Sequence, residues 1–225
     1  MTRFLPPLDN DWYDGQAPED LAIALLGQLL CRRSREGVTV GRILETEAYL
    51  ATDDSAAHSA HGINRKNAAM FGPPGRAYVY TIHARQCVNV VTEAAGRGSA
   101  VLIRALEPLQ GIARMEQRRN TTVLRDLCRG PARLCEALAI GRALNGWNLS
   151  RGQRLWIAGD PEFRGCEILV SPRIGVTSAA EKPLRFFASA NPFVSGTGKF
   201  NRQATRLSAP PLWSDHLSDG DCSQC

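Results

Sequence analysis

Lysine is almost absent from this chain of 225 residues. It occurs only at Lys66, Lys182 and Lys199, which leaves 24 of the 27 basic residues as arginine. Arginine offers carboxylates and phosphates a rigid, two-pronged donor that lysine lacks. Two interpretations of the excess stay open here: a preference for binding anions, and a GC-rich genome that encodes arginine cheaply.

Long hydrophobic runs are missing as well. No segment approaches the roughly 18 consecutive apolar residues that a membrane span needs, and the N-terminal residues carry acids and no apolar stretch typical of a signal peptide. The seven cysteines follow no tight spacing, which favours reduced thiols over a disulfide framework. We therefore expect a cytoplasmic protein with no membrane partner.

The composition is that of an ordinary globular domain, with 44% hydrophobic and 22% charged residues. The formal net charge of +5 argues little by itself, but it is unevenly spread. Residues 21–207 hold 26 bases and 14 acids, a net charge of +12, whereas 1–20 and 208–225 are acidic (−4 and −3). The central region therefore has the charge excess expected of a protein that contacts phosphates.

Turn signals and hydrophobic patterns divide the chain into an irregular lead-in (1–17), one domain (18–207) and a loose acidic tail (208–225). Strands without alternating helices predict an α+β domain with a mostly antiparallel sheet. The expected helices cover 18–30, 64–71, 108–119, 122–128 and 132–140. The expected strands cover 38–50, 76–83, 87–92, 99–105, 153–158, 167–174 and 184–188.

Two glutamates stand at the end of an apolar strand. Side chains alternate along a strand, so Glu45, Glu47 and Tyr49 share one face. Neighbouring carboxylates there are costly unless they are paired, and one of them could act as a general base. The alternative is a solvated strand end with one glutamate in an arginine salt bridge.

Other polar residues interrupt nearby apolar segments. Arg104 lies within an expected strand and needs a carboxylate partner, for which Glu47 is a candidate. Tyr78 and Tyr80 share a face, as packed core residues also would. His58 is a base or ligand candidate, and with His61 it could form half a metal site, although no second half has suitable spacing.

Cysteines offer one further pattern, the pair Cys222 and Cys225 at the end of the chain. Such a pair could be half a zinc site or a redox pair, but its place in the tail favours a dispensable segment. Cys128 and Cys135 are expected to be packed thiols.

An ordered series of motifs over about 20–196 resembles the alkyladenine (3-methyladenine) DNA glycosylase family. The motifs are LETEAYL (44–50), AAHS (56–59), YVY (78–80), RALEP (104–108), GP (130–131), LC (134–135), LA (138–139), RIGV (173–176) and KPLRF (182–186). The resemblance implies a curved antiparallel sheet surrounded by helices, similar to the C-terminal domain of methionyl-tRNA formyltransferases. It also implies excision of alkylated or deaminated purines, such as 3-methyladenine or hypoxanthine, from duplex DNA.

The resemblance further assigns catalytic positions. The family flips the damaged nucleotide out of the duplex, and a glutamate that matches Glu47 activates the water that attacks C1′. The arginine and the backbone carbonyl that hold this water match Arg104 and Ile174. The residues that enclose the flipped base match Tyr49, His58, Tyr80 and Asn89.

One position departs from the family pattern. The family usually inserts a tyrosine into the duplex, and His83 stands at this position within a segment (81–87) that is one residue shorter. His83 is planar and could still fill the gap left by the flipped base. The hairpin 92–99, by contrast, is about two residues longer than in relatives.

No lysine occurs in the matched pocket segments, so Schiff-base chemistry is not expected and the enzyme should lack lyase activity. The resemblance requires no metal and no cofactor, and a searching glycosylase works well as a monomer. Two alternatives stay open: a noncatalytic nucleic-acid-binding module on the same fold, and a metal-dependent hydrolase that uses His58, His61 and Glu47.

Overall fold

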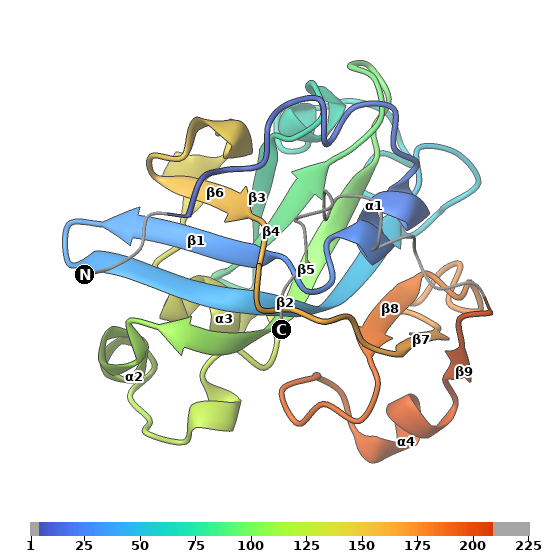
Figure 1. Ribbon diagram of the computed structural model, residues 1–225. Helices are drawn as coiled ribbons and strands as arrows, with labels where there is room; N and C mark the ends of the chain where they lie inside the picture. The colour runs from blue at the N-terminus through green and yellow to red at the C-terminus, as the bar shows by residue number, and fades with distance from the viewer. Residues whose placement is uncertain (1–4, 209–225) are drawn as a thin grey trace, which may run out of the picture.

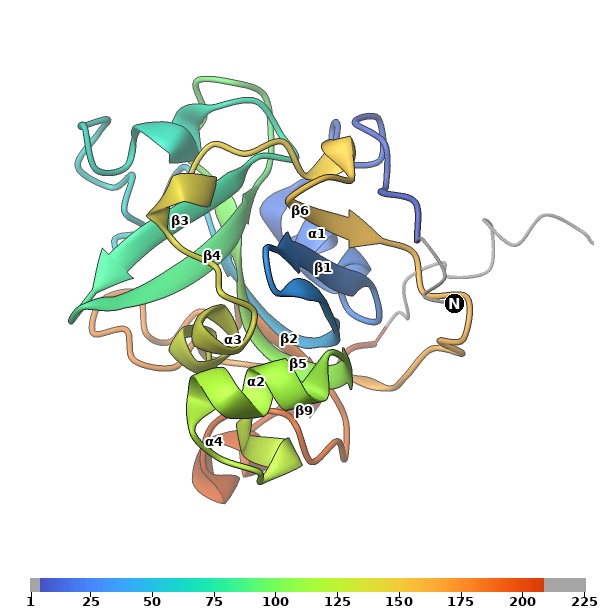
Figure 2. The same ribbon diagram turned by 90° about the vertical axis from the view of Figure 1, so that its left-hand side faces the viewer.

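One open, curved sheet of nine strands dominates the computed structural model, which describes residues 5–208 (Figures 1 and 2). The strands are β1 (Leu29–Ser34), β2 (Gly37–Tyr49), β3 (Ala77–Ile82), β4 (Arg85–Val91), β5 (Ala100–Gln110), β6 (Leu155–Ala158), β7 (Ile168–Ser171), β8 (Arg185–Ala188) and β9 (Thr205–Arg206). The α-helices are α1 (Pro18–Ala24), α2 (Ile112–Arg119), α3 (Pro131–Ala137) and α4 (Gly198–Arg202).

The sheet runs in the order β3-β4-β5-β2-β8-β7-β9, and each of these pairings is antiparallel. β1 leaves this path, because it pairs with the first half of β2 and, on its other side, with β6. The predicted single α+β domain with a mostly antiparallel sheet is confirmed.

β2 is the central strand, and its second half is buried almost without interruption. It pairs with β5 along most of its length, while β8 joins its other edge only at residues 45–47. α1 packs on β2 and β5, and α3 packs on β4 and β5, as both views show (Figures 1 and 2). Both helices belong to the main core, on the face of β2 that carries Thr46, whereas Ile174 and Ser195 lie against Glu45 and Glu47 on the opposite face.

The helix expected over 18–30 is too long. α1 ends at Ala24, Gly27 adopts a left-handed φ of +84°, and Leu29 and Leu30 already belong to β1. A buried strand that follows a buried helix gives one continuous apolar run, so hydrophobicity alone did not separate the two.

The expected helices at 108–119 and 122–128 also need correction. β5 continues through Gln110, and α2 starts only after Gly111, whose φ is +76°. The segment 122–128 contains a single 3₁₀ turn (Leu124–Asp126), and 64–71 contains only another (Ala68–Phe71). The remaining expected strands are present but mostly shorter, and residues 172–174 lie beyond the end of β7.

The N-terminal segment differs from the domain that follows it. Residues 5–17 contain no helix and no strand, yet Tyr13 is fully buried against the domain. Cys222 and Cys225 lie outside the described residues. No helix in the described range is long and apolar enough to cross a membrane.

Candidate active site

Glu45 and Glu47 lie in the middle of the sheet, where both are 0% exposed. This burial comes from the segments after β7 and β8, because Ile174 and Ser195 lie directly against the two carboxylates. The alternative of a solvated strand end is therefore wrong. Two ionisable carboxylates so deep in a protein require partners of opposite charge.

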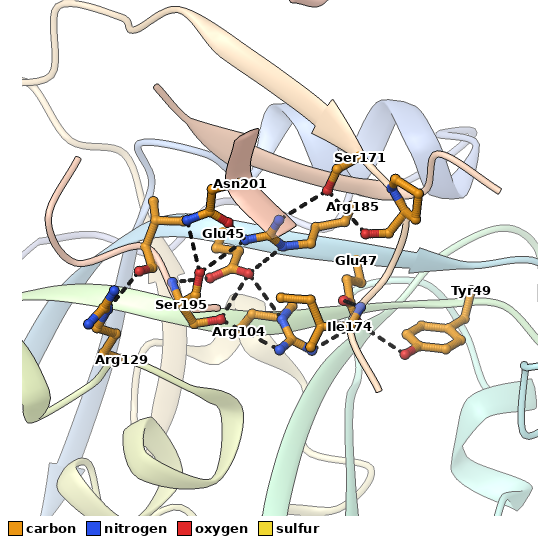
Figure 3. A network of polar contacts seen from close by, with 12 residues as sticks. Glu45, Glu47, Tyr49, Arg104, Arg129, Ser171, Ile174, Arg185, Ser195 and Asn201 are labelled. Atoms are coloured by element: carbon orange, nitrogen blue, oxygen red, sulfur yellow. Dashed lines mark hydrogen bonds and ion pairs between the residues drawn. The ribbon is translucent and has the colours of Figure 1, made fainter. Parts of the chain in front are cut away.

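Arg104 of β5 supplies a positive charge to both carboxylates (Figure 3). Its Nε donates to Glu45 at 3.1 Å, and its Nη1 lies 3.1 Å from an oxygen of Glu47. The ion pair with Glu47 that the sequence suggested is thus present, but one guanidinium serves two glutamates. The side chain of Arg104 is only 9% exposed, so water screens these ion pairs little.

Glu45 has a second set of partners at the other side of the cluster (Figure 3). Arg185 of β8 donates its Nε–H to Glu45 at 2.6 Å, and Ser195 donates from its backbone N–H at 2.6 Å and from its hydroxyl at 2.9 Å. Gly196 has a φ of +85°, a conformation that lets the backbone turn directly after Ser195. Neither Arg185 nor Ser195 was a sequence candidate.

Glu47 is held from the opposite side (Figure 3). The hydroxyl of Tyr49 donates to one carboxylate oxygen at 3.0 Å, and the backbone N–H of Ile174 donates to the other at 2.7 Å. Ile174 thereby lies next to the carboxylate. The role of its carbonyl in holding water stays a prediction.

Charges decide the protonation of this cluster. Burial disfavours the ionised form of Glu45, but Arg104 and Arg185 outweigh it and hold the pKa of this carboxyl below its ordinary value. Burial likewise works against the charge on Arg104, yet the two glutamates raise its pKa. Burial and the neighbouring Glu47 raise the pKa of Tyr49, so its hydroxyl keeps the proton that it donates.

An open cavity of about 260 Å³ lies next to this cluster. Its walls come from β2, β3, β4 and the segments 55–58 and 175–178, and they include Tyr49, His58, Tyr80 and Asn89. The cavity is slightly smaller than the roughly 300–1,000 Å³ of sites for drug-sized ligands. A single heterocyclic base is a suitable occupant.

Aromatic rings line one side of the cavity. The rings of His58 and Tyr80 meet at a centroid distance of 4.5 Å, and Nδ1 of His58 lies 2.8 Å from the hydroxyl of Tyr78. Burial lowers the pKa of His58, so its ring is neutral at pH 7. Tyr78 and Tyr80 share a face as expected, but that face borders the cavity as well as the core.

Asn89 and His83 lie on the hairpin of β3 and β4. Asn89 is 3% exposed, and its amide donates to the carbonyl of Tyr78 at 2.9 Å, which fixes its orientation in the cavity wall. His83 is exposed and forms the two-residue turn with Ala84, both at positive φ (46° and 61°). His83 therefore lies exposed at the hairpin tip.

A second buried ion pair holds the cavity walls. Both oxygens of Asp54 accept from Arg173, at 2.6 and 2.7 Å, and both side chains are 0% exposed. Arg173 also donates to the carbonyl of Ala48 and covers the ring of Tyr49 at 4.6 Å. The pair thus joins the loop after β2 to the segment after β7 and supports Tyr49.

This ion pair leads to a prediction about stability against pH. The pKa of Asp54 is lowered from its ordinary value of 3.8, because the bonds from Arg173 and from two backbone N–H groups outweigh its burial. The stabilisation is therefore complete above pH 3.8 and is lost as the pH falls further. We expect Asp54→Asn to lose about 2 kcal/mol at pH 7 and to show a weaker acid dependence. Urea unfolding at pH 7 and pH 3 measures both, and equal loss at the two values would contradict the assignment.

The sequence offered a signal for the missed arginine at 185. Arg185 interrupts the apolar segment 184–188 in the same way as Arg104 interrupts its own strand. The rule that a charge in an apolar strand needs a partner therefore applied to both. Ser195 and Asp54 gave no such signal, because they lie in loops.

The candidate metal site does not form among the described residues. His61 is exposed, His58 faces Tyr78, and no group of three His, Cys, Asp or Glu within 5–208 could hold a metal ion. A wider groove of about 530 Å³ adjoins the cavity instead, and it shares His58 and Tyr80. Lys66 and Arg142 give this groove positive charge.

Comparison with known proteins points to one family. The family model for methylpurine-DNA glycosylase (MPG) matches residues 11–192. A protein of Rhodopirellula baltica, provisionally named 3-methyladenine DNA glycosylase, is 47% identical over 205 residues, which cover 88% of this chain and 87% of the relative. The human DNA-3-methyladenine glycosylase is 40% identical over 218 residues, which cover 90% of this chain and 72% of the relative.

Proposed function

The chain belongs to the methylpurine-DNA glycosylase family, and we propose that it excises 3-methyladenine and related damaged purines from duplex DNA by hydrolysing the N-glycosidic bond. One observation supports this proposal above all. Glu47 is a buried carboxylate held by Arg104, Tyr49 and Ile174 directly beside an aromatic cavity of the size of one base.

The reaction uses the cavity and the glutamate together. A base inside a duplex is out of reach, so the nucleotide flips into the cavity. Glu47 takes a proton from water, the water oxygen bonds to C1′, and the N-glycosidic electron pair leaves with the base. A cationic methylated purine thus departs as a neutral molecule. Arg104 and the carbonyl of Ile174 hold the water, and attack opposite the base inverts C1′.

Selection of the base comes from the cavity walls. Tyr49, His58 and Tyr80 stack on the flipped purine, and electron-rich rings favour the positive charge of methylated bases. Because His58 is neutral at pH 7, it adds no repulsion against such a cation. Asn89 disfavours the amino group of guanine. Hypoxanthine lacks this group, so it can be a second substrate.

Binding to DNA relies on positive charge near the cavity. Lys66 and Arg142 in the adjoining groove contact phosphates, and His83 at the hairpin tip fills the gap left by the flipped base. The protein acts as a monomer in the cytoplasm, where the five free cysteines of the described range stay reduced. No lysine among the described cavity-lining residues is available for a Schiff base, so the enzyme releases the base and leaves the abasic strand uncut.

A base-release assay on damaged duplexes tests this proposal. We expect the protein to release 3-methyladenine or hypoxanthine, to leave the abasic strand intact and to act equally in EDTA. A protein that binds undamaged and abasic duplexes equally and releases no base would instead be a noncatalytic nucleic-acid-binding module.

Replacing an aromatic wall of the cavity tests the stacking role. Tyr80→Ala should reduce both the affinity for a damaged duplex and the release rate by roughly 10- to 100-fold, because stacking on one aromatic ring contributes about 1–3 kcal/mol per base. Tyr80→Phe retains the ring and should stay near the wild-type rate. Titration with labelled duplex and single-turnover release measure the two effects, and an equal loss in both variants would contradict stacking.

A further inference from the structure

Four buried charges at the centre of the sheet balance one another. Glu45 and Glu47 carry two negative charges, Arg104 and Arg185 carry two positive ones, and none of the four is more than 7% exposed. Replacing one of these four residues by a neutral one leaves the buried cluster with a net charge, positive if a glutamate is replaced and negative if an arginine is replaced. The effect of that charge on the others is strong, because little water screens it.

The two glutamates share these positive charges unequally (Figure 3). Glu47 has an ion pair with Arg104 alone among the pairs described, and Arg104 also binds Glu45. Arg185 binds Glu45, and its two terminal nitrogens donate hydrogen bonds to Ser171, Ser195 and Asn201. Arg185 is also the register partner of Glu47 across β2 and β8, so its charge acts on Glu47 directly as well as through Glu45 and Arg104.

This division matters for a general base. A carboxylate that faces an undivided guanidinium is strongly stabilised as an anion and accepts a proton poorly. The negative charge of Glu45 offsets part of the positive charge of Arg104, and Arg185 in turn neutralises the negative charge of Glu45. Glu47 is thus fixed by an arginine that it shares with a second carboxylate.

We infer that Glu45 and Arg185 are positioning residues of the reaction, which set the basicity of Glu47 by dividing the charge of Arg104 between two carboxylates. The inference rests on the proposed role of Glu47 as the base. It adds two charged residues that act on Glu47 and are not proposed to touch the water or the purine.

Other titratable and charged groups also face Glu47, from every strand packed around it. They are Glu45 and Tyr49 on β2, Tyr80 on β3, Cys87 on β4, Arg104 on β5, Arg185 on β8 and Arg173 after β7. Substitutions at Glu45 and Arg185 leave all the others in place. A change in the pH dependence can then be assigned to the altered charge.

Two single variants should shift the acid limb of the single-turnover pH profile in opposite directions. The acid limb is the part of the profile in which the release rate rises with pH. Glu45→Gln removes a negative charge, so the limb should move to lower pH by on the order of one unit and the maximal rate should fall. Arg185→Gln removes a positive charge, so the limb should move to higher pH by a similar amount. Arg185→Lys keeps the charge and should bring the limb back toward the wild type.

Two further variants separate charge from structure. The double variant Glu45→Gln/Arg185→Gln removes both charges, so its acid limb should return near the wild-type pH. It also tests the inference if one of the single variants does not fold, because it leaves no unpaired charge in the cluster. Ser195→Ala removes a neutral donor to Glu45 and should leave the limb in place. Limbs that move in one direction for both single variants, or a Ser195→Ala shift equal to that of Glu45→Gln, would overturn the inference, as would a displaced limb in the double variant.

The failure of this inference is distinct from the failure of the proposed function. If Glu47→Gln abolishes release and the limbs of the Glu45 and Arg185 variants do not move, only the inference is wrong. If Glu47→Gln keeps the wild-type rate, the assignment of the base itself is wrong.

Discussion

Arg104→Met should destabilise the protein by about 3–5 kcal/mol, the usual cost of leaving a buried charge without its partner. The side chains of Glu45 and Glu47 are 0% exposed, so bulk solvent does not stabilise their charges once the guanidinium is lost. Glu45 keeps Arg185, but Glu47 loses its ion pair entirely. Base release should disappear as well, because the same arginine holds the water.

Urea unfolding measures this effect against a matched surface pair. Arg206→Gln breaks an ion pair with Glu167 at a side chain that is 76% exposed, and it should cost far less, because water screens an exposed pair. Arg104→Lys keeps the charge but cannot reach two carboxylates with one planar group, so we expect an intermediate loss. An Arg104→Met protein as stable as Arg206→Gln would show that the buried pairs stabilise little.

Glu47→Gln should reduce base release by about 10³-fold, within the range typical of a lost general base. The amide has nearly the shape of the carboxylate and can still accept from the N–H of Ile174, so the fold should persist. Affinity for a damaged duplex should be unchanged, since the cavity walls stay intact. Glu162→Gln, at an exposed glutamate beside a separate cavity, is the matched control and should keep the wild-type rate.

Much of this site follows from the sequence by simple rules. Alternation along a strand placed Glu45 and Glu47 on one side, and the need of Arg104 for a carboxylate connected two strands that are 57 residues apart at positions 47 and 104. These rules work because a strand has only two faces and a buried charge has few acceptable partners.

Other features depend on contacts that no local pattern encodes. Asp54 and Arg173 are 119 positions apart, and the Ser195 that binds Glu45 is 150 positions away, in a loop. Loops bring such donors to the site through the overall packing of the sheet, which local periodicity cannot show. The end of α1 was misplaced for a related reason, because burial makes helix and strand equally apolar around Gly27.

The most direct test of the account is single-turnover release by Glu47→Gln, with enzyme in excess and every damaged duplex bound. Under these conditions binding is saturated, so the observed rate reports only the chemical step. The account predicts that the duplex stays bound while the base is released about 10³-fold more slowly than by the wild type. Release at the wild-type rate would contradict the central claim that Glu47 activates the attacking water.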